Sequence, residues 1–148
     1  RLLVVGDGSL KKEAQKFTRD HRLKNVHFAG IVPSEILHSY YTTADIFCSP
    51  ATHGESFGIV LLEAMASSLP IVASRISGYS ELLKKEGLLV SPKDSKELAQ
   101  ALKTLIKNES LRQDLGKKGL GTAKKYDWEI IGSKILTSYQ KILKHPRR

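Results

Sequence analysis

The chain has 148 residues, 41% of them hydrophobic and 26% charged, which suits one domain with a real core. No apolar run approaches the roughly 18 residues that a membrane span requires. The net charge of +9 comes from basic residues spread along the expected helices; this favours a solvated surface, keeps contact with an anionic membrane surface as an alternative, and argues against nucleic acid.

Short apolar runs alternate with helical patterns in chain order. The continuously apolar run Leu2–Val5 predicts a buried strand, closed by a glycine turn. Ser9 and Ser95 are the expected caps of two helices. Further strands are expected at 26–29, 46–48, 71–73 and 88–90, and helices at 11–20, 34–42, 57–67, 80–83, 96–107, 110–125 and 128–143. Glycines at 116, 119 and 121 are expected to interrupt the helix over 110–125.

This alternation is typical of a parallel sheet covered by helices on both faces. We therefore expect an α/β, Rossmann-like domain with ligands at the carboxyl ends of its strands.

Three small features have plain interpretations. Cys48 lies in an apolar run and is expected to be a buried structural thiol. Gly6-Asp7-Gly8 predicts a tight turn, because the third glycine of a dinucleotide fingerprint is missing. The histidines show no metal-ligand spacing, so no metal site is expected.

The segment from Gly54 to Ala66 follows the third expected strand, at the edge where ligands bind. Its helix is apolar all round, so we expect it to be buried on nearly every side, with Glu63 as its only charge. A buried carboxylate without partners costs several kcal/mol. The hydroxyls of a ribose would be suitable donors to Glu63, and a buried lysine or arginine is the alternative partner.

The start of this helix has the features of an anion site. Gly58 allows close approach to the backbone, and Ile59 and Val60 are expected to have free N–H groups in the first turn. These donors and the helix dipole would suit a diphosphate. Glu55 precedes the helix, so the two carboxylates cannot share one helix face. Glu55 is therefore either a separate contact on one extended ligand or a cap of the helix.

The run Glu55–Ala66 resembles the signature of the family-4 retaining glycosyltransferases of the GT-B fold, in which seven residues separate two glutamates. Weaker resemblances at 3–8, 26–32, 41–50, 70–74, 78–81 and 126–128 extend over almost the whole chain. The pattern from Cys48 to Glu63 is most similar to phosphatidylinositol mannosyltransferases and their relatives. One departure is Ser68, where the family usually has a glycine with positive φ at the end of the helix.

The resemblance implies the donor-binding, C-terminal domain of a hexosyltransferase. Such an enzyme moves mannose or glucose from a nucleoside diphosphate sugar, such as GDP-mannose, to a lipid or glycan acceptor. Glu55 would be its catalytic residue. The donor sugar would be bound by His53, Gly54, Glu55, Ser56, Phe57 and Gly58, the diphosphate by Ile59 and Val60, the ribose by Glu63, and the base by Ile31 and Val32.

The resemblance also concerns domain organisation. Residues 1–127 would be the donor domain without its first strand–helix unit, which carries an arginine and a lysine that clamp the diphosphate. Residues 128–148 would be a crossover helix and a basic tail. The partner of that helix is an N-terminal acceptor domain, so some of its apolar residues are expected to be exposed: Ile130, Ile131, Ile135 and Leu136.

Further expectations concern ligands and location. No tightly bound cofactor is expected beyond the donor substrate, although a divalent cation would come with its diphosphate. The expected place is the cytoplasm, peripheral to the membrane face, and the fragment alone is expected to be inactive. The alternative function is a non-catalytic domain of the same fold that binds a nucleotide or a partner protein.

Overall fold

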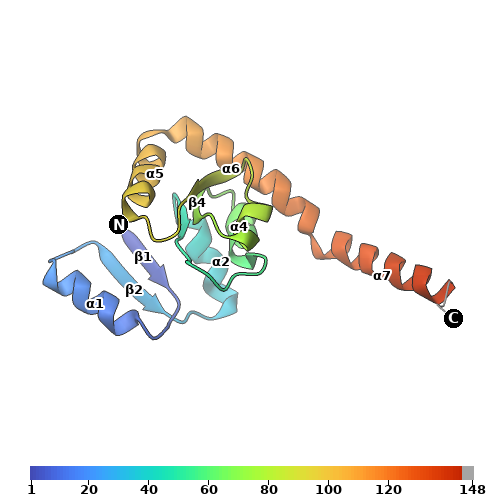
Figure 1. Ribbon diagram of the computed structural model, residues 1–148, viewed down its shortest axis with the longest axis horizontal. Coiled ribbons are helices and arrows are strands. Elements are labelled where there is room, and N and C mark those ends of the chain that lie inside the picture. The colour runs from blue at the N-terminus through green and yellow to red at the C-terminus, as the bar shows by residue number, and fades with distance from the viewer. Residues whose placement is uncertain (145–148) are drawn as a thin grey trace. The chain divides into compact units, whose positions relative to one another are not determined.

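A computed structural model describes residues 1–144 (Figure 1). The chain divides into two units, Arg1–Tyr40 and Tyr41–Arg148. The first contains β1 (Leu2–Val5), α1 (Lys11–Asp20) and β2 (Val26–Gly30), and α2 (Ser34–Thr42) crosses the division. The second contains β3 (Phe47–Ser49), α3 (Ile59–Ala66), β4 (Ile71–Ser74), α4 (Ser77–Leu82), β5 (Gly87–Val90), α5 (Ser95–Lys107), α6 (Glu109–Ala123), the 3-10 turn η1 (Lys124–Tyr126) and α7 (Trp128–Lys144). Beyond Lys144, the predicted basic tail lies outside the described residues.

The first unit is a parallel pair of strands with one helix. Leu2 of β1 pairs with Val26 of β2. The expectation of a buried first strand is wrong, because Leu2 is 53% exposed and its neighbours in β1 are also largely accessible. Within residues 1–40, a second short strand and a helix without buried residues offer too little apolar surface to cover it.

The second unit has a parallel three-stranded sheet in the order β3-β4-β5. The central strand β4 is buried along its whole length, because it pairs on both edges and helices cover it. The parallel α/β class is thus confirmed, although the strands form two sheets where one was expected. Two apolar clusters make the core: one joins α3 and α4 to β4, and the other joins α5 and α6 to β4 and β5.

The helix caps differ from the sequence expectation. α5 is capped by Asp94, whose Oδ1 accepts from the N–H groups of Lys96 and Glu97 at 3.0 and 2.9 Å, so Ser95 is the first helical residue. α1 begins after Leu10 with no side-chain cap, which leaves Ser9 outside the helix. In both cases the expected cap was displaced by one residue.

α6 is continuous, so its glycines do not interrupt it. They serve close packing instead. A Cβ at Gly116 would lie 2.1 Å from the carbonyl oxygen of Ser68, and one at Gly119 would lie 3.2 Å from Cγ of Met65. α6 therefore packs on the C-terminal half of α3 at a distance that a larger side chain would prevent.

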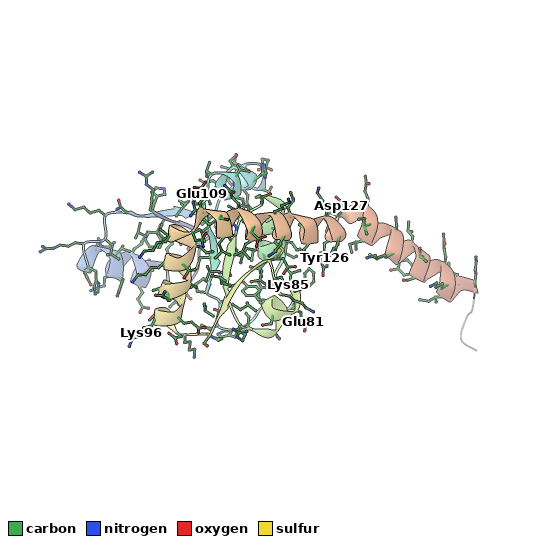
Figure 2. All side chains as sticks on the ribbon, turned by 90° about the horizontal axis from the view of Figure 1, so that it is seen from above. Glu81, Lys85, Lys96, Glu109, Tyr126 and Asp127 are labelled. Carbon is green, nitrogen blue, oxygen red and sulfur yellow. The ribbon has the colours of Figure 1, made fainter. Side chains whose placement is uncertain are left out.

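α7 follows α6 through η1, and Figure 2 shows Tyr126 and Asp127 at this junction. As expected, three of the four apolar residues named for this helix are largely exposed, with Leu136 at 63%, and Ile131 is half-buried. α7 has no fully buried residue. Among residues 1–144, no helix has the length and apolar character needed to cross a membrane.

Candidate functional site

The loop between β3 and α3 carries the residues predicted to bind the donor sugar, at the carboxyl edge of the three-stranded sheet. It ends at Gly58, whose φ of +92° turns the chain into the helix, so α3 begins two residues later than expected. A Cβ at Gly58 would lie 2.9 Å from Cδ1 of Tyr79. Both the left-handed backbone and this contact therefore require glycine at position 58.

The first turn of α3 has unpaired backbone donors. The earliest N–H groups bonded within the helix belong to Leu61 and Leu62, and both donate to the Gly58 carbonyl. The N–H groups of Ile59 and Val60 therefore have no acceptor inside the helix. The Ile59 side chain is 64% exposed, so the helix is open to solvent here rather than buried on nearly every side. This helix start has the geometry and the dipole of an anion site.

Glu55 is half-buried and hydrogen-bonded to a buried tyrosine. The Tyr79 hydroxyl donates to Glu55 Oε2 at 3.1 Å and lies 2.6 Å from the hydroxyl of Ser49, the last residue of β3. Burial raises the pKa of Tyr79; the Ser49 bond lowers it and the Glu55 carboxylate raises it further. Within residues 1–144, Glu55 bonds this phenol and not the start of α3, so the interpretation as a helix cap is wrong.

α4 packs against the backbone of the loop between β3 and α3. A Cβ at Gly78 would lie 2.6 Å from the carbonyl oxygen of Glu55 and 3.0 Å from the backbone nitrogen of Phe57. The backbone of α4 therefore packs directly on the backbone of the loop. Tyr79, the next residue, is only 2% exposed and continues this contact to Gly58.

Glu63 has a tyrosine partner as well. The Tyr41 hydroxyl, at the end of α2, donates to Glu63 Oε2 at 2.7 Å. The Tyr41 ring packs against Phe47 of β3, with centroids 5.6 Å apart. Burial raises the pKa of Tyr41, and the bond to Glu63 adds to this effect. Within residues 1–144, Glu63 has no ion pair, so the alternative of a buried lysine or arginine partner is wrong.

The remaining predicted residues have less defined surroundings. His53, Gly54 and Ser56 are exposed in the loop, and the Phe57 ring contacts the Tyr126 ring at 5.6 Å between centroids. Ile31, which is 81% exposed, and the half-buried Val32 belong to the first unit, so their predicted contact with the base stays a prediction.

The sequence motif gives no sign of two residues of this site, Ser49 and Tyr41. On sequence alone, Tyr79 after Gly78 fits a cleft residue and core packing equally well. The structure shows that Tyr79 is both, because its ring is buried and its hydroxyl reaches Glu55. These partners are 22 to 30 residues apart in sequence, so no local spacing could have linked them.

Two further expectations concern reactive groups. Cys48 is half-buried next to Ser49, and burial raises the pKa of its thiol, which agrees with an inert structural role. Asp7 accepts from the Gly8 N–H at 2.7 Å and pairs with Lys11. In the described part of the chain, no three His, Cys, Asp or Glu side chains gather as metal ligands.

Comparison with known proteins gives the site a context. Residues 1–121 match the family described as glycosyl transferases group 1. The chain is 35% identical over 144 residues to a phosphatidyl-myo-inositol mannosyltransferase of Mycobacterium leprae, covering 96% of this chain and 38% of that protein. It is 33% identical to a sulfoquinovosyl transferase of Arabidopsis thaliana, covering 91% of this chain and 27% of that protein. The chain thus spans well under half the length of these relatives.

Solved structures agree with the sequence matches. A sucrose-phosphate synthase from Thermosynechococcus elongatus superposes with a TM-score of 0.86 at 28% identity, covering 97% of this chain and 38% of that chain. The Anabaena HepE protein in complex with UDP gives a TM-score of 0.85 at 26% identity, covering 94% and 40%. The same Anabaena protein has also been solved with UDP-glucose.

Proposed function

Because the chain belongs to the glycosyl transferases group 1 family and has the GT-B type of fold, we propose that it is the donor-binding domain of a retaining glycosyltransferase. The reaction would transfer a hexose, mannose or glucose, from a nucleoside diphosphate sugar. One observation carries the proposal. The loop and α3 carry two carboxylates, Glu55 and Glu63, each hydrogen-bonded to a tyrosine. Between them in sequence lies the start of α3, whose first N–H groups have no acceptor inside the helix.

The three parts of this arrangement suit three parts of one donor. The N–H groups of Ile59 and Val60 would bind the diphosphate, where the helix dipole favours negative charge. Glu63, the fifth residue of the helix, would accept from the ribose hydroxyls. Glu55, in the loop, would accept from the donor sugar as the catalytic residue, with further sugar contacts from His53, Gly54, Ser56, Phe57 and Gly58. Ile31 and Val32 would contact the base.

Departure of the diphosphate is the step that this geometry would assist. As the bond to the sugar breaks, negative charge grows on the leaving diphosphate and positive charge grows on the sugar. Preorganised N–H donors stabilise the first charge, and a nearby carboxylate such as Glu55 stabilises the second. A divalent cation bound to the diphosphate would add to the same stabilisation.

The name of one relative, a phosphatidyl-myo-inositol mannosyltransferase, supports a lipid acceptor. The net charge of +9 supports work at an anionic membrane surface on the cytoplasmic side. The matched region is the smaller part of each relative. Acceptor binding would belong to an N-terminal domain, as the family resemblance implies. α7 would then be the helix that packs on that domain.

The test is binding of a nucleotide panel, observed by ligand NMR. UDP, GDP and ADP and their sugar conjugates are titrated with the unmodified chain, with Glu63→Ala and with Glu63→Gln, which keeps the side-chain volume. We expect one diphosphate series to bind, and both variants to weaken it at least about tenfold, because a carboxylate acceptor for hydroxyls is lost.

The matched control is Glu129→Ala, which removes an exposed carboxylate in the first turn of α7. It is expected to bind like the unmodified chain. The proposal is wrong if no diphosphate binds, or if the Glu63 variants bind as well as the control.

A further inference from the structure

The two carboxylates proposed to bind the donor are each held by one tyrosine phenol that comes from another element. We propose that Tyr79 and Tyr41 are positioning residues of the donor site: Tyr79 aims Glu55 at the donor sugar, and Tyr41 aims Glu63 at the ribose. This inference rests on the proposed function and assigns the two tyrosines separate effects on two parts of the same ligand.

The hydrogen-bond roles around Tyr79 follow from its single proton. An ionised carboxylate only accepts, so the phenol donates its proton to Glu55 Oε2. The Ser49 hydroxyl, 2.6 Å from the same phenol oxygen, must then be the donor in that pair. The Ser49 hydroxyl at the end of β3 therefore donates to the Tyr79 phenol of α4, and this phenol donates to Glu55 in the loop. The two bonds together fix the direction of the phenol O–H.

Tyr79 also has little freedom to move. Its side chain is 2% exposed, and its ring lies so close to Gly58 that a Cβ there would clash at 2.9 Å. A carboxylate on a surface loop would otherwise sample several rotamers, each with an entropic cost on binding. The bond to a buried phenol selects one direction for Glu55 before the ligand arrives.

Tyr41, at the end of α2, is proposed to orient Glu63 in the same way. Its ring is packed on Phe47, and its hydroxyl reaches Glu63 Oε2 at 2.7 Å. Both phenols bind one oxygen, Oε2, of their carboxylate. Among residues 1–144, neither Glu55 Oε1 nor Glu63 Oε1 has a hydrogen-bond partner, and no buried polar side-chain atom is left unsatisfied. Each carboxylate is thus held by one oxygen and keeps the other for a ligand hydroxyl.

The experiment measures two affinity ratios on the full chain. The first compares UDP-glucose with UDP and reports on the sugar; the second compares UDP with 2′,3′-dideoxy-UDP and reports on the ribose. If the panel selects guanine, GDP-mannose, GDP and the dideoxy analogue of GDP are used. We expect Tyr79→Phe to reduce the first ratio about threefold to tenfold and to leave the second unchanged, as loss of one orienting hydrogen bond implies. Tyr41→Phe is expected to reduce the second ratio by a similar factor and to leave the first unchanged.

Loss of stability alone cannot produce this result, because it would weaken all ligands alike and leave both ratios unchanged. Ser49→Ala frees the Tyr79 phenol without removing it and is expected to lower the first ratio, which provides a second variant if Tyr79→Phe does not fold. Tyr139→Phe on α7, where the side chain is exposed, is the control that should change neither ratio.

The possible failures are distinguishable. If the unmodified chain binds no diphosphate, the proposed function itself falls, and this inference with it. If the unmodified chain binds and shows both preferences, but Tyr79→Phe and Tyr41→Phe keep them or lower both together, the donor site stands and the positioning roles are wrong.

Discussion

Ser68 has a conformation that its side chain disfavours. Its φ is +58°, as the resemblance to a glycine-bearing family predicted for this position. The Ser68 N–H donates to the Met65 carbonyl and the Leu69 N–H donates to the Ala64 carbonyl, which together close the end of α3. The Ser68 carbonyl then meets Gly116 of α6. The strain is tolerated because this close packing depends on the turn.

Replacing this serine by glycine should stabilise the chain. We expect Ser68→Gly to raise the free energy of unfolding by about 0.5–1 kcal/mol, since the left-handed backbone costs glycine nothing. The control is Ser67→Gly, one residue earlier, where φ is −88° and glycine should lower the free energy by a similar amount. Urea unfolding of both variants measures the difference, and a loss of stability in both would contradict the explanation.

Glu86 joins the turn before β5 to α6. Its carboxylate accepts from the N–H groups of Lys84 and Lys85 and from the Thr122 hydroxyl. Burial acts to raise its pKa, but these hydrogen bonds outweigh burial, and the pKa lies below its ordinary value. A group with a lowered pKa stabilises the fold above its unfolded pKa, near 4.5, and this stabilisation is lost as the pH falls through the folded pKa.

Thr122→Val removes one of these donors while keeping the side-chain shape. We expect it to lower the free energy of unfolding by about 0.5–1 kcal/mol near neutral pH, a modest value because the carboxylate is partly exposed. The deficit should shrink at a second, acidic pH below the folded pKa of Glu86, which is lower than 4.5, because the carboxylate is then protonated. Unfolding curves at the two pH values test this. Thr104→Val, on exposed α5 surface, should show no such pH dependence, and an equal deficit at both pH values would contradict the assignment.

At the scale of elements, α4 shapes the loop between β3 and α3, which we propose to bind the donor sugar. It is short, and its second residue, Gly78, is in backbone contact with Glu55, Ser56 and Phe57. Because the two backbones are in contact, residues 55–57 could not shift here without moving α4. The loop is therefore preorganised by a helix that comes later in the chain.

Gly78→Ala tests this support. The added Cβ would lie 2.6 Å from a backbone oxygen, so we expect a loss of about 1–3 kcal/mol in the free energy of unfolding and a weaker affinity for the diphosphate series. Gly121→Ala is the matched control, because its Cβ would meet nothing within 4 Å; inside a helix it should stabilise by about 0.5–1 kcal/mol. Thermal unfolding and the NMR titration measure both effects. If Gly78→Ala binds and unfolds like the unmodified chain, α4 does not shape the loop.

The sequence predicted most elements because their apolar periodicity is strong, as in α5 and in β4. The ends of elements were harder to predict. Gly58 was expected inside the helix, but it precedes α3 and turns the chain into it. Asp94, and not Ser95, is the N-cap of α5, because its carboxylate accepts from two N–H groups. The two glutamates of the site could be identified from their motif, but their phenol partners could not, since those contacts depend on tertiary packing.

At the scale of the whole molecule, the α/β class was predictable and the extent of burial was not. Residues 2–5 have the composition of a buried strand, yet β1 pairs with one strand in its unit and remains largely exposed. Apolar composition states what a segment can bury, and the neighbouring elements decide what it does bury. The same holds for α7, where the Trp128 side chain is exposed despite its size.

The contact of α6 with α3 has a consequence for how the second unit opens. Gly116 and Gly119 bring the two helices so close that neither can separate without breaking the turn at Ser68 and uncovering Met65, which is fully buried. Local opening follows such boundaries, because elements that share a buried contact lose it together. The backbone amides of α3 and α6 are therefore expected to exchange as one cooperative unit, which couples α3 to a helix about fifty residues later in the chain.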